Sequence, residues 1–203
     1  MARHSSSTSN PATRDNLLAL AARLFGTQGY SATTMRAIAE HAGIEAASIY
    51  YHFPSKEDLI NEVMQHGSKR ILDCVDEALG RVPAGATAEA RFRAAVLGFM
   101  TGIVRHGEFA LVNTRTLGQL PDTVRSAHVK RREGYQKLWQ GLLEDLRAEG
   151  QLRAEVDLAI CRVMIMGSVT NMQAWFNPRK GSVEKVAEKV CNVFFEGVRP
   201  RST

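Results

Sequence analysis

Apolar residues recur at helical spacing along most of the 203-residue chain. The first such stretch starts at Thr13, and its positions i, i+3, i+4 and i+7 are Leu18, Ala21, Ala22 and Phe25. Gly29 follows, and glycine is common just beyond a helix C-terminus. The pattern predicts a helix from Thr13 to shortly before Gly29, preceded by a serine-rich flexible arm at residues 1–12.

Two short helices joined by a tight turn are predicted next. Thr33 is a suitable N-cap for the first of them, in which Ile38 faces inward. Gly43 then permits a left-handed turn, because glycine has no Cβ to obstruct it. The second short helix covers residues 45–52 and ends before Pro54, since the residue before a proline disfavours the helical conformation.

Helical patterns separated by glycine and proline continue to the end of the chain. Ser55 with Asp58 three positions later resembles a capping box, with Asp in place of the usual Glu. The helices expected after it cover about residues 56–79, 88–105, 108–117, 121–149, 158–175 and 183–197. No stretch alternates in the manner of a strand. We predict an all-α fold of about nine helices, with an N-terminal domain over residues 13–60 and a C-terminal helical domain over residues 61–203.

The last two predicted helices are unusually apolar. Apolar side chains surround most of the first of them: Leu158, Ile160, Cys161, Val163, Met164, Ile165, Met166, Val169, Met172, Trp175 and Phe176. A helix that is apolar on all sides is expected to be buried on all sides. The final helix carries an apolar stripe of Val183, Val186, Ala187, Val190 and Phe194. These helices either complete the core of one chain or form a four-helix bundle with a second copy.

Composition and charge exclude several classes of protein without naming a function. The apolar content of 44% and the charged content of 23% are ordinary for a globular chain. No apolar stretch is long enough to span a membrane, and no signal peptide is recognisable, so we expect a cytoplasmic protein that does not associate with membranes. Cys74, Cys161 and Cys191 lie in apolar runs and are expected to be buried without forming disulfides.

The net charge of +5 and the basic pI of about 9.3 fit a nucleic acid or an anionic ligand as partner. The first 66 residues, however, hold five Lys and Arg against six Asp and Glu, so the excess of positive charge lies in the remainder of the chain. Bulk charge therefore does not locate a DNA-binding face, and a motif must do so.

Residues 29–59 hold such a motif. Two short helices joined by a glycine turn form a helix-turn-helix, in which the second helix presents its start to the major groove. The core that sets their angle is predicted to be Ile38, Ala42, Ile44 and Ile49. The opposite, solvent-facing side is predicted to carry Thr33, Thr34, Arg36, Ala46, Ala47, Ser48, Tyr51, His52 and Lys56. Hydroxyl, imidazole and ammonium groups suit phosphate binding, and the helix start at Lys56 adds a positive dipole.

This motif resembles the DNA-binding domain of the TetR family of transcription regulators, over roughly residues 14–62. The matching residues are Gly29-Tyr30, Thr33-Thr34, Ile38-Ala39, Ala42-Gly43, Ser48-Ile49-Tyr50-Tyr51-His52-Phe53 and Ser55-Lys56-Glu57. The resemblance implies a ligand-responsive repressor that binds operator DNA as a homodimer and releases it when a small molecule binds the C-terminal domain. It also favours dimerisation through the last two helices.

The resemblance assigns roles to individual residues. Thr34, Tyr50, His52 and Lys56 fall on positions that contact phosphates in the family, whereas Arg36, Ala46, Ala47, Ser48 and Tyr51 fall where bases or sugar edges are contacted. Each position has a structural alternative. Packing is the preferred role for Tyr50 and Phe53, contact with DNA is preferred for Tyr51 and His52, and Lys56 is either a phosphate ligand or a solvated lysine.

The start of the second short helix departs from the family pattern. Many relatives place Lys, Arg, Gln or Asn there, whereas this chain has Ala46 and Ala47, which offer only methyl contacts to thymine. Direct readout of bases would then depend on Arg36, Ser48 and Tyr51, with DNA shape supplying much of the remaining specificity. Glu45 would either accept a hydrogen bond from cytosine or cap the helix.

A pocket for a small apolar effector is expected in the C-terminal domain. Its predicted apolar wall comprises Phe99, Met100, Leu111, Trp139, Met166, Met172, Trp175 and Phe176, and its predicted polar groups are Asn113, Arg115, Asn171 and Gln173. The alternative is that these residues form ordinary core. The stretch from Asn171 to Pro178, followed by Arg179 and Lys180, is similar to a feature of family members that sense acyl-CoA thioesters, and the basic C-terminal domain would suit that anionic ligand.

The leading hypothesis is therefore a dimeric, ligand-responsive repressor without a cofactor. A helical carrier of lipid-like molecules that lacks specific DNA binding is the alternative. An enzyme is not expected, because nucleotide-binding, zinc-protease and serine-hydrolase motifs are absent. No metal site is expected either, because the six histidines form no i, i+4 pair and no C-x-x-C sequence occurs.

Overall fold

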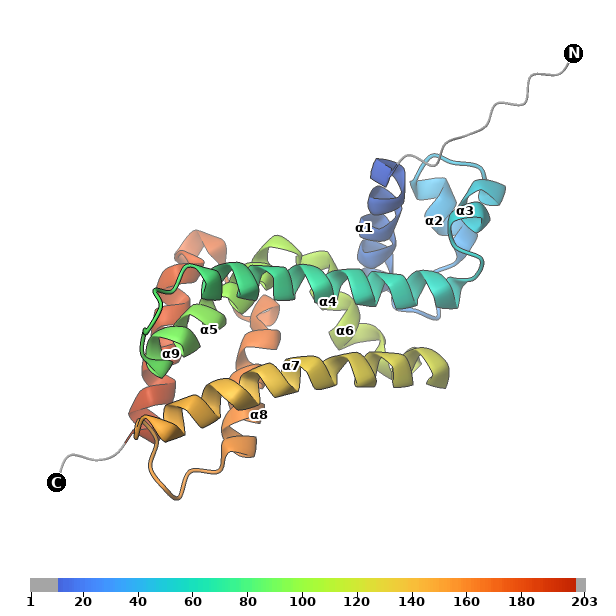
Figure 1. The fold of residues 1–203 in the computed structure, drawn as a ribbon. Coiled ribbons are helices and arrows are strands. Elements are labelled where there is room, and N and C mark those ends of the chain that lie inside the picture. Colours follow the sequence, from blue (N-terminus) through green and yellow to red (C-terminus); the bar gives the residue numbers. More distant parts are fainter. Residues whose placement is uncertain (1–10, 200–203) are drawn as a thin grey trace, which may run out of the picture.

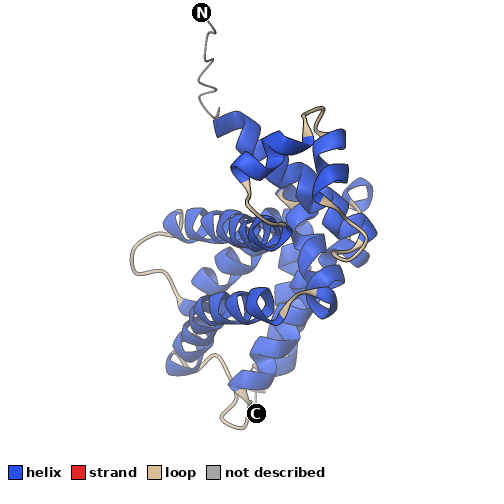
Figure 2. Ribbon diagram, turned by 90° about the vertical axis from the view of Figure 1, so that its right-hand side faces the viewer, coloured by secondary structure: helices blue, strands red, loops and turns tan. Residues whose placement is uncertain are grey.

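The structure, a computed structural model, describes residues 11–199, with the side chains of residues 11–13 and 113–114 left undescribed. Most of the predicted flexible arm lies outside these residues. The helices are α1 (Pro11–Gln28), α2 (Met35–His41), α3 (Ala46–His52), α4 (Lys56–Gly80), α5 (Ala88–Arg105), α6 (Gly107–Thr116), α7 (Asp122–Ala148), α8 (Leu158–Thr170) and α9 (Val183–Val198). Three short 3-10 turns, η1 (Leu117–Gln119), η2 (Met172–Ala174) and η3 (Pro178–Lys180), complete them. No strand occurs in residues 11–199, which confirms the all-α prediction (Figure 2).

Local sequence signals account for most helix ends. Ser55 Oγ accepts a hydrogen bond from the Asp58 N–H at the start of α4, and Ser182 and Asp157 cap α9 and α8 in the same manner. Gly29 and Gly43 have φ of 87° and 67°, the left-handed conformation that lets the chain turn after α1 and α2. These termini therefore follow from side chains that are neighbours in sequence.

Three predicted boundaries are wrong. The N-cap of α2 is Thr34, whose Oγ1 accepts from the Ala37 N–H, and not Thr33. Pro121 is the N-cap of α7 instead of its first helical residue. The helix expected to continue to Trp175 ends at Thr170, because the chain tightens into the 3-10 turn η2.

Helix α4 runs along both halves of the molecule (Figure 1). Its N-terminal part packs beside α1 and its C-terminal part lies against α5. The α4–α5 contact is close because Gly98 and Gly102 face α4: an added Cβ at Gly98 would lie 2.6 Å from the Cys74 carbonyl oxygen, and one at Gly102 would lie 2.9 Å from the Ile71 Cα. A Cβ at Gly67 would collide with the Phe109 side chain of α6. Helix α4 is thus fixed on two sides at backbone distance.

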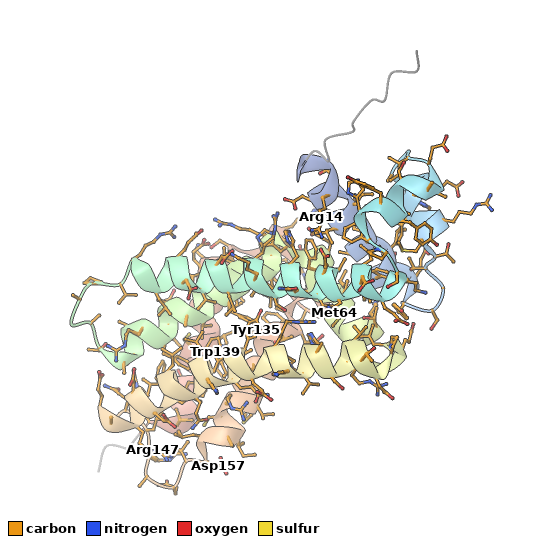
Figure 3. All side chains as sticks on the ribbon, turned by 45° about the vertical axis from the view of Figure 1, so that its right-hand side comes forward. Arg14, Met64, Tyr135, Trp139, Arg147 and Asp157 are labelled. Carbon is orange, nitrogen blue, oxygen red and sulfur yellow. The ribbon has the colours of Figure 1, made fainter. Side chains whose placement is uncertain are left out.

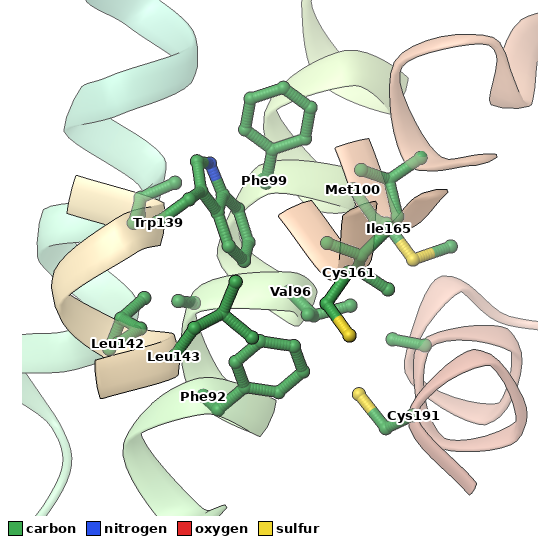
Figure 4. Close-up of a cluster of buried hydrophobic side chains, with 14 of the residues drawn as sticks. Phe92, Val96, Phe99, Met100, Trp139, Leu142, Leu143, Cys161, Ile165 and Cys191 are labelled. Atoms are coloured by element: carbon green, nitrogen blue, oxygen red, sulfur yellow. The ribbon is translucent and has the colours of Figure 1, made fainter. Parts of the chain in front are cut away.

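Two apolar clusters form the interior. Figure 3 labels one member of each, Met64 of the N-terminal cluster and Trp139 of the C-terminal cluster. The N-terminal cluster is formed by helices α1, α2, α3 and α4 and includes Phe25 and Ile38, together with Phe53 directly after α3. Helices α6 and α7 also contribute to it, through residues such as Phe109 and Val124. The C-terminal cluster surrounds Trp139 and joins α5, α7, α8 and α9 (Figure 4). Residues of the second half of the chain therefore complete the core of the first half.

Helices α8 and α9 are not buried on all sides in the single chain, contrary to the prediction for α8. Leu158, Cys161, Ile165 and Val169 of α8 are buried in the C-terminal cluster. The outer surfaces leave apolar side chains in water: Ile160, Val163 and Met164 on α8 and Val193 on α9. The three cysteines are buried and unpaired, as predicted. Among the described residues, no helix combines the length and apolar character that crossing a membrane requires.

Candidate DNA-binding surface and effector pocket

The α2–α3 pair is set on a small apolar base that leaves its outer face free. Ile38 and Ile49 are fully buried and fix the angle between the two helices, as the sequence predicts. Arg36 on α2 and Ser48 on α3 are exposed, and Tyr51 is 71% exposed. Because an aromatic side chain gains free energy by burial, a tyrosine held in water at the end of a recognition helix is available for contact with a partner.

Thr33 does not face solvent, which contradicts the prediction. Its side chain is fully buried, and its Oγ1 donates to the Gly29 carbonyl oxygen at 2.8 Å. This hydrogen bond closes the loop between α1 and α2, so Thr33 has a structural role. The neighbouring Thr34 is exposed and combines the N-cap of α2 with a position on the outer face.

The aromatic run of α3 divides differently from the prediction. Phe53 is buried, as expected, but Tyr50 is 52% exposed, so the packing role preferred for Tyr50 is wrong. His52 is half-buried, and its ring meets that of Tyr51 edge to face with centroids 5.5 Å apart. Both tyrosines and the histidine therefore remain on the accessible side of α3.

The first turn of α3 is exposed and weakly polar. Ala46 and Ala47 are exposed, so these positions offer only methyl groups to a partner. Glu45, at the N-cap position, makes no side-chain hydrogen bond to the helix, which excludes the capping role considered for it. Its carboxylate stands in water beside the two alanines.

Lys56 at the start of α4 is held in place by an aromatic ring. Its Nζ lies over the Tyr30 ring, 4.2 Å from the centroid, in a cation–π contact. Partial burial lowers the pKa of Lys56 from its usual value. The ammonium group is thus positioned next to the loop between α1 and α2, at the edge of the exposed face. Glu57 and Asp58 follow it in the first turn and limit the positive charge of this helix start.

A pocket of about 440 Å³ opens between α4, α5, α7 and α8 in the C-terminal domain. Four predicted pocket residues line it: Phe99, Trp139, Met166 and Asn171. Three do not. Met100 is buried in the core instead, and Arg115 is exposed away from the cavity. Trp175 is 47% exposed and donates from Nε1 to the Ser168 carbonyl oxygen. The side chain of Asn113 lies outside the described residues.

Helix α7 forms a wall of the pocket of which the sequence predicted only Trp139. Helix α7 contributes His128, Arg132, Tyr135 and Trp139, which are spaced i, i+4, i+7 and i+11 and therefore share one face of the helix. This spacing was readable in the sequence, but polar residues within it hid the face. Tyr135 donates from its hydroxyl to the Ser68 carbonyl oxygen at 2.5 Å, and burial raises the pKa of Tyr135 to about 12.

His128 is a buried polar group at this wall. It is only 3% exposed, and burial lowers its pKa to about 4, with further lowering by the nearby charges of Arg131 and Arg132. The imidazole is therefore neutral at physiological pH. The same wall carries a charged group, Arg132, which is exposed and has no ion-pair partner within the described part of the chain.

The pocket and the N-terminal domain share elements. Leu117 of η1 lines the pocket and also packs against the N-terminal apolar cluster. Two residues later, Gln119 accepts a hydrogen bond through Oε1 from the Ser31 N–H in the loop that leads to α2. A change in the position of η1 on ligand binding would therefore reach the loop that supports the α2–α3 pair.

These features define a class of protein: a helical regulator with a DNA-binding helix-turn-helix and a separate effector-binding domain. The family model described as "Bacterial regulatory proteins, tetR family" matches residues 17–63, and that described as "Tetracyclin repressor-like, C-terminal domain" matches residues 85–198. The chain belongs to the TetR family of transcription regulators. Members of this family bind operator DNA and small-molecule effectors and act as dimers, so the chain is a ligand-responsive, DNA-binding regulator.

Individual relatives support this assignment over almost the full chain. The HTH-type transcriptional repressor KstR2 of Mycolicibacterium smegmatis is 29% identical over 201 residues, which cover 94% of this chain and 93% of that protein. The structure of the ketosteroid transcriptional regulator KstR2 of Mycobacterium tuberculosis has a TM-score of 0.80 at 23% identity, with 95% and 97% coverage. The fatty acid degradation regulator FadR from Bacillus halodurans has a TM-score of 0.76 at 21% identity, with 95% and 98% coverage. The two structural likenesses show a common fold.

The low pKa of His128 predicts a specific pH dependence of stability. The unfolded chain binds a proton at this histidine below about pH 6.5, whereas the folded chain binds it only near pH 4, so acidification favours unfolding between these values. Between pH 7 and pH 5 the free energy of unfolding should fall by about 2 kcal/mol more in the unchanged protein than in the His128→Gln variant. Urea unfolding at both pH values measures this difference, and parallel pH profiles would contradict the prediction.

Proposed function

We propose that the protein is a transcriptional repressor that binds its operator as a homodimer and is released from it by an elongated, largely apolar effector. The observation that carries this proposal is the combination of an exposed, aromatic-rich recognition helix with a 440 Å³ pocket that touches the N-terminal core. The KstR2 relatives are named as repressors, which supports repression as the direction of control.

The proposed DNA surface comprises the members of the predicted set that are exposed or half-buried. Thr34, Tyr50, His52 and Lys56 would contact phosphates, and Arg36, Ala46, Ala47, Ser48 and Tyr51 would contact bases or sugar edges. Seven of these residues are exposed and His52 and Lys56 are half-buried, and this accessibility supports the assignment. Since this domain carries no excess of positive charge, specific contacts matter more here than general attraction to DNA.

Loss of a contact side chain should weaken DNA binding. We expect Arg36→Ala and Tyr51→Ala each to reduce affinity by about 10- to 100-fold, because each removes a contact at the groove. Mobility-shift titrations with duplexes from the DNA that flanks the gene measure the effect, and Arg81→Ala, an exposed arginine at the far end of α4, is the control. If the folded protein binds none of these duplexes at low salt, the lipid-carrier hypothesis replaces the repressor.

The uncovered apolar surfaces of α8 and α9 support dimerisation through these helices. Ile160, Val163, Met164 and Val193 are all more than half exposed in the single chain, although each is apolar. Exposed apolar patches of this kind mark sites of association. A two-fold dimer would place the two recognition helices about 34–36 Å apart, the spacing of successive major grooves on one side of DNA.

A charge on the proposed interface should separate the two copies. We expect Met164→Glu and Val193→Glu to give monomers in sedimentation velocity, since an unpaired carboxylate would be buried at the interface. DNA affinity should fall by about 100-fold or more, because one recognition helix alone cannot use both half-sites. Val129→Glu, at a half-exposed valine on α7, is the matched control and should remain dimeric. Dimers in all three variants would place the interface elsewhere.

An acyl-CoA thioester is the effector class that we propose. The pocket has an apolar interior lined by side chains such as Ile71, Phe99 and Ile103, and two arginines, Arg132 and Arg162, stand at its wall. This arrangement suits an acyl chain that is joined to an anionic group. The names of the relatives refer to ketosteroids and fatty acid degradation, and the basic charge of the C-terminal domain suits the phosphates of coenzyme A.

An acyl-CoA thioester should release the protein from DNA more effectively than the free fatty acid or free coenzyme A. We expect decanoyl-CoA to raise the apparent dissociation constant for DNA by about tenfold or more, with decanoate and free coenzyme A much less effective. The Arg132→Ala variant should respond more weakly, whereas Lys130→Ala, an exposed neighbour outside the pocket, should respond like the unchanged protein. Equal effects of decanoate and decanoyl-CoA would exclude recognition of coenzyme A.

A further inference from the structure

The indole nitrogen of Trp139 is a buried donor without a partner among the residues that the structure describes. Trp139 is fully buried, and its Nε1 has no hydrogen-bond partner among the described residues. An indole N–H only donates, so a neighbouring group cannot satisfy it unless that group has a free lone pair. Buried donors are rarely left unpaired, because the loss of hydration is not compensated. This one calls for an acceptor that the described residues do not supply.

The nitrogen lies on the pocket side of the tryptophan. Trp139 packs edge to face between Phe92 and Phe99, with ring centroids 6.0 Å and 5.9 Å away. Figure 4 shows the nitrogen at the end of the indole nearest Phe99, whereas the six-membered ring points toward Phe92. Phe99 lines the pocket and Phe92 does not. The unpaired N–H therefore lies on the side of Trp139 that borders the pocket-lining Phe99, away from the side that packs against Phe92.

The charged groups of the pocket lie nearer to solvent than the indole does. Arg132 is exposed and Arg162 is half-buried, and neither forms an ion pair within residues 11–199. Arg132 precedes Trp139 by seven residues on the same face of α7, which places their backbones about 10 Å apart. An anion would remain partly hydrated beside the arginines, whereas at the buried indole it would lose its hydration. The acceptor that suits Trp139 is consequently uncharged.

A second buried nitrogen without a partner among the described residues also lies on the pocket-facing side of α7. His128 Nδ1 also lacks a partner among the described residues, and His128 precedes Trp139 by eleven residues, or about 16 Å of helix. The low pKa of His128 leaves the ring neutral, so it is able to donate or accept a hydrogen bond. Polar groups thus occur at both ends of the α7 wall, and α5 and α8 contribute apolar side chains to the rest of the pocket.

We infer that the effector is an elongated molecule with an uncharged carbonyl oxygen that accepts the Trp139 N–H, an apolar body, and an anionic group that lies beside Arg132. This inference rests on the proposed role of the pocket as the effector site and adds the chemistry of the buried end. A ketone or ester oxygen at that end distinguishes the effector from a plain saturated acyl chain, which would leave the donor unpaired.

Matched pairs of acids test the inference directly. The probes are methyl-keto acids of ten to fourteen carbons, with the ketone next to the terminal methyl group, each compared with the plain fatty acid of the same length. In the Trp175→Phe variant, Trp139 is the remaining tryptophan, so a single indole N–H signal reports on it in ¹H–¹⁵N spectra. We expect at least one keto acid to bind about tenfold more tightly than its plain partner and to move the indole proton downfield.

A second variant separates the hydrogen bond from packing. Trp139→Phe keeps an aromatic ring and removes the N–H, so it should bind both members of the pair with equal affinity while the dispersed spectrum of a folded protein persists. If Trp139→Phe fails to fold, the indole signal and the two affinities measured in the Trp175→Phe protein are sufficient for the test. Equal affinities in the protein that retains Trp139, no binding by either acid at millimolar concentration, or an unmoved indole signal would each overturn the inference and leave water as the partner of the donor.

DNA binding provides an independent readout. Mobility shifts with the flanking duplexes distinguish the two possible failures. A protein that prefers the keto acid but binds no DNA contradicts the proposed function and retains the inference. A protein that binds DNA but does not distinguish the two acids contradicts the inference alone.

Discussion

Close packing around helix α4 is the constraint on which the rest of the structure depends. Its first turn carries Lys56 at the edge of the proposed DNA surface, and its last turns lie in the core of the effector domain. Glycines at positions 98 and 102 bring α5 to backbone distance from α4, and Gly67 admits the Phe109 ring of α6. Because close-packed interiors transmit displacement instead of absorbing it, α4 cannot move in one domain without affecting the other.

A few shared residues connect the pocket to the α2–α3 pair. Leu117 belongs to the pocket wall and to the N-terminal cluster, and Gln119 holds the loop before α2 through Ser31. The opposite wall reaches the face proposed for dimerisation, since Val163 lines the pocket and is also exposed on α8. A ligand in this cavity touches elements that position the DNA-binding domain and elements that would position the second copy.

Fully buried polar groups are few in the pocket wall, and this makes each of them informative. Tyr135 is already satisfied by the Ser68 carbonyl oxygen, whereas Trp139 and His128 carry buried nitrogen atoms without partners among the described residues. In an apolar environment an unpaired donor costs more free energy than one hydrogen bond contributes in water. Under the proposed function, the effector domain would select its ligand through the buried polar groups that remain without a partner in its wall.

The sequence by itself determined the helices and the recognition motif, because those signals are local. Caps such as Ser55, the left-handed turn at Gly43 and the apolar spacing along each helix act between near neighbours. Burial is not local. Thr33 was predicted to be exposed and is buried by its hydrogen bond to Gly29, and Tyr50 was expected to pack and is exposed.

Tertiary structure alone decided which side chains meet in the pocket. The pocket-lining face of α7 lies opposite α5 and α8, which are distant from it in sequence. The periodicity of α7 therefore shows which of its residues share a face, but not which helices that face contacts. Trp175 illustrates the same limit, since α8 ends early and turns that residue out to the surface. Helical spacing is set by the backbone, whereas cavities arise from the gaps between helices that are distant in sequence.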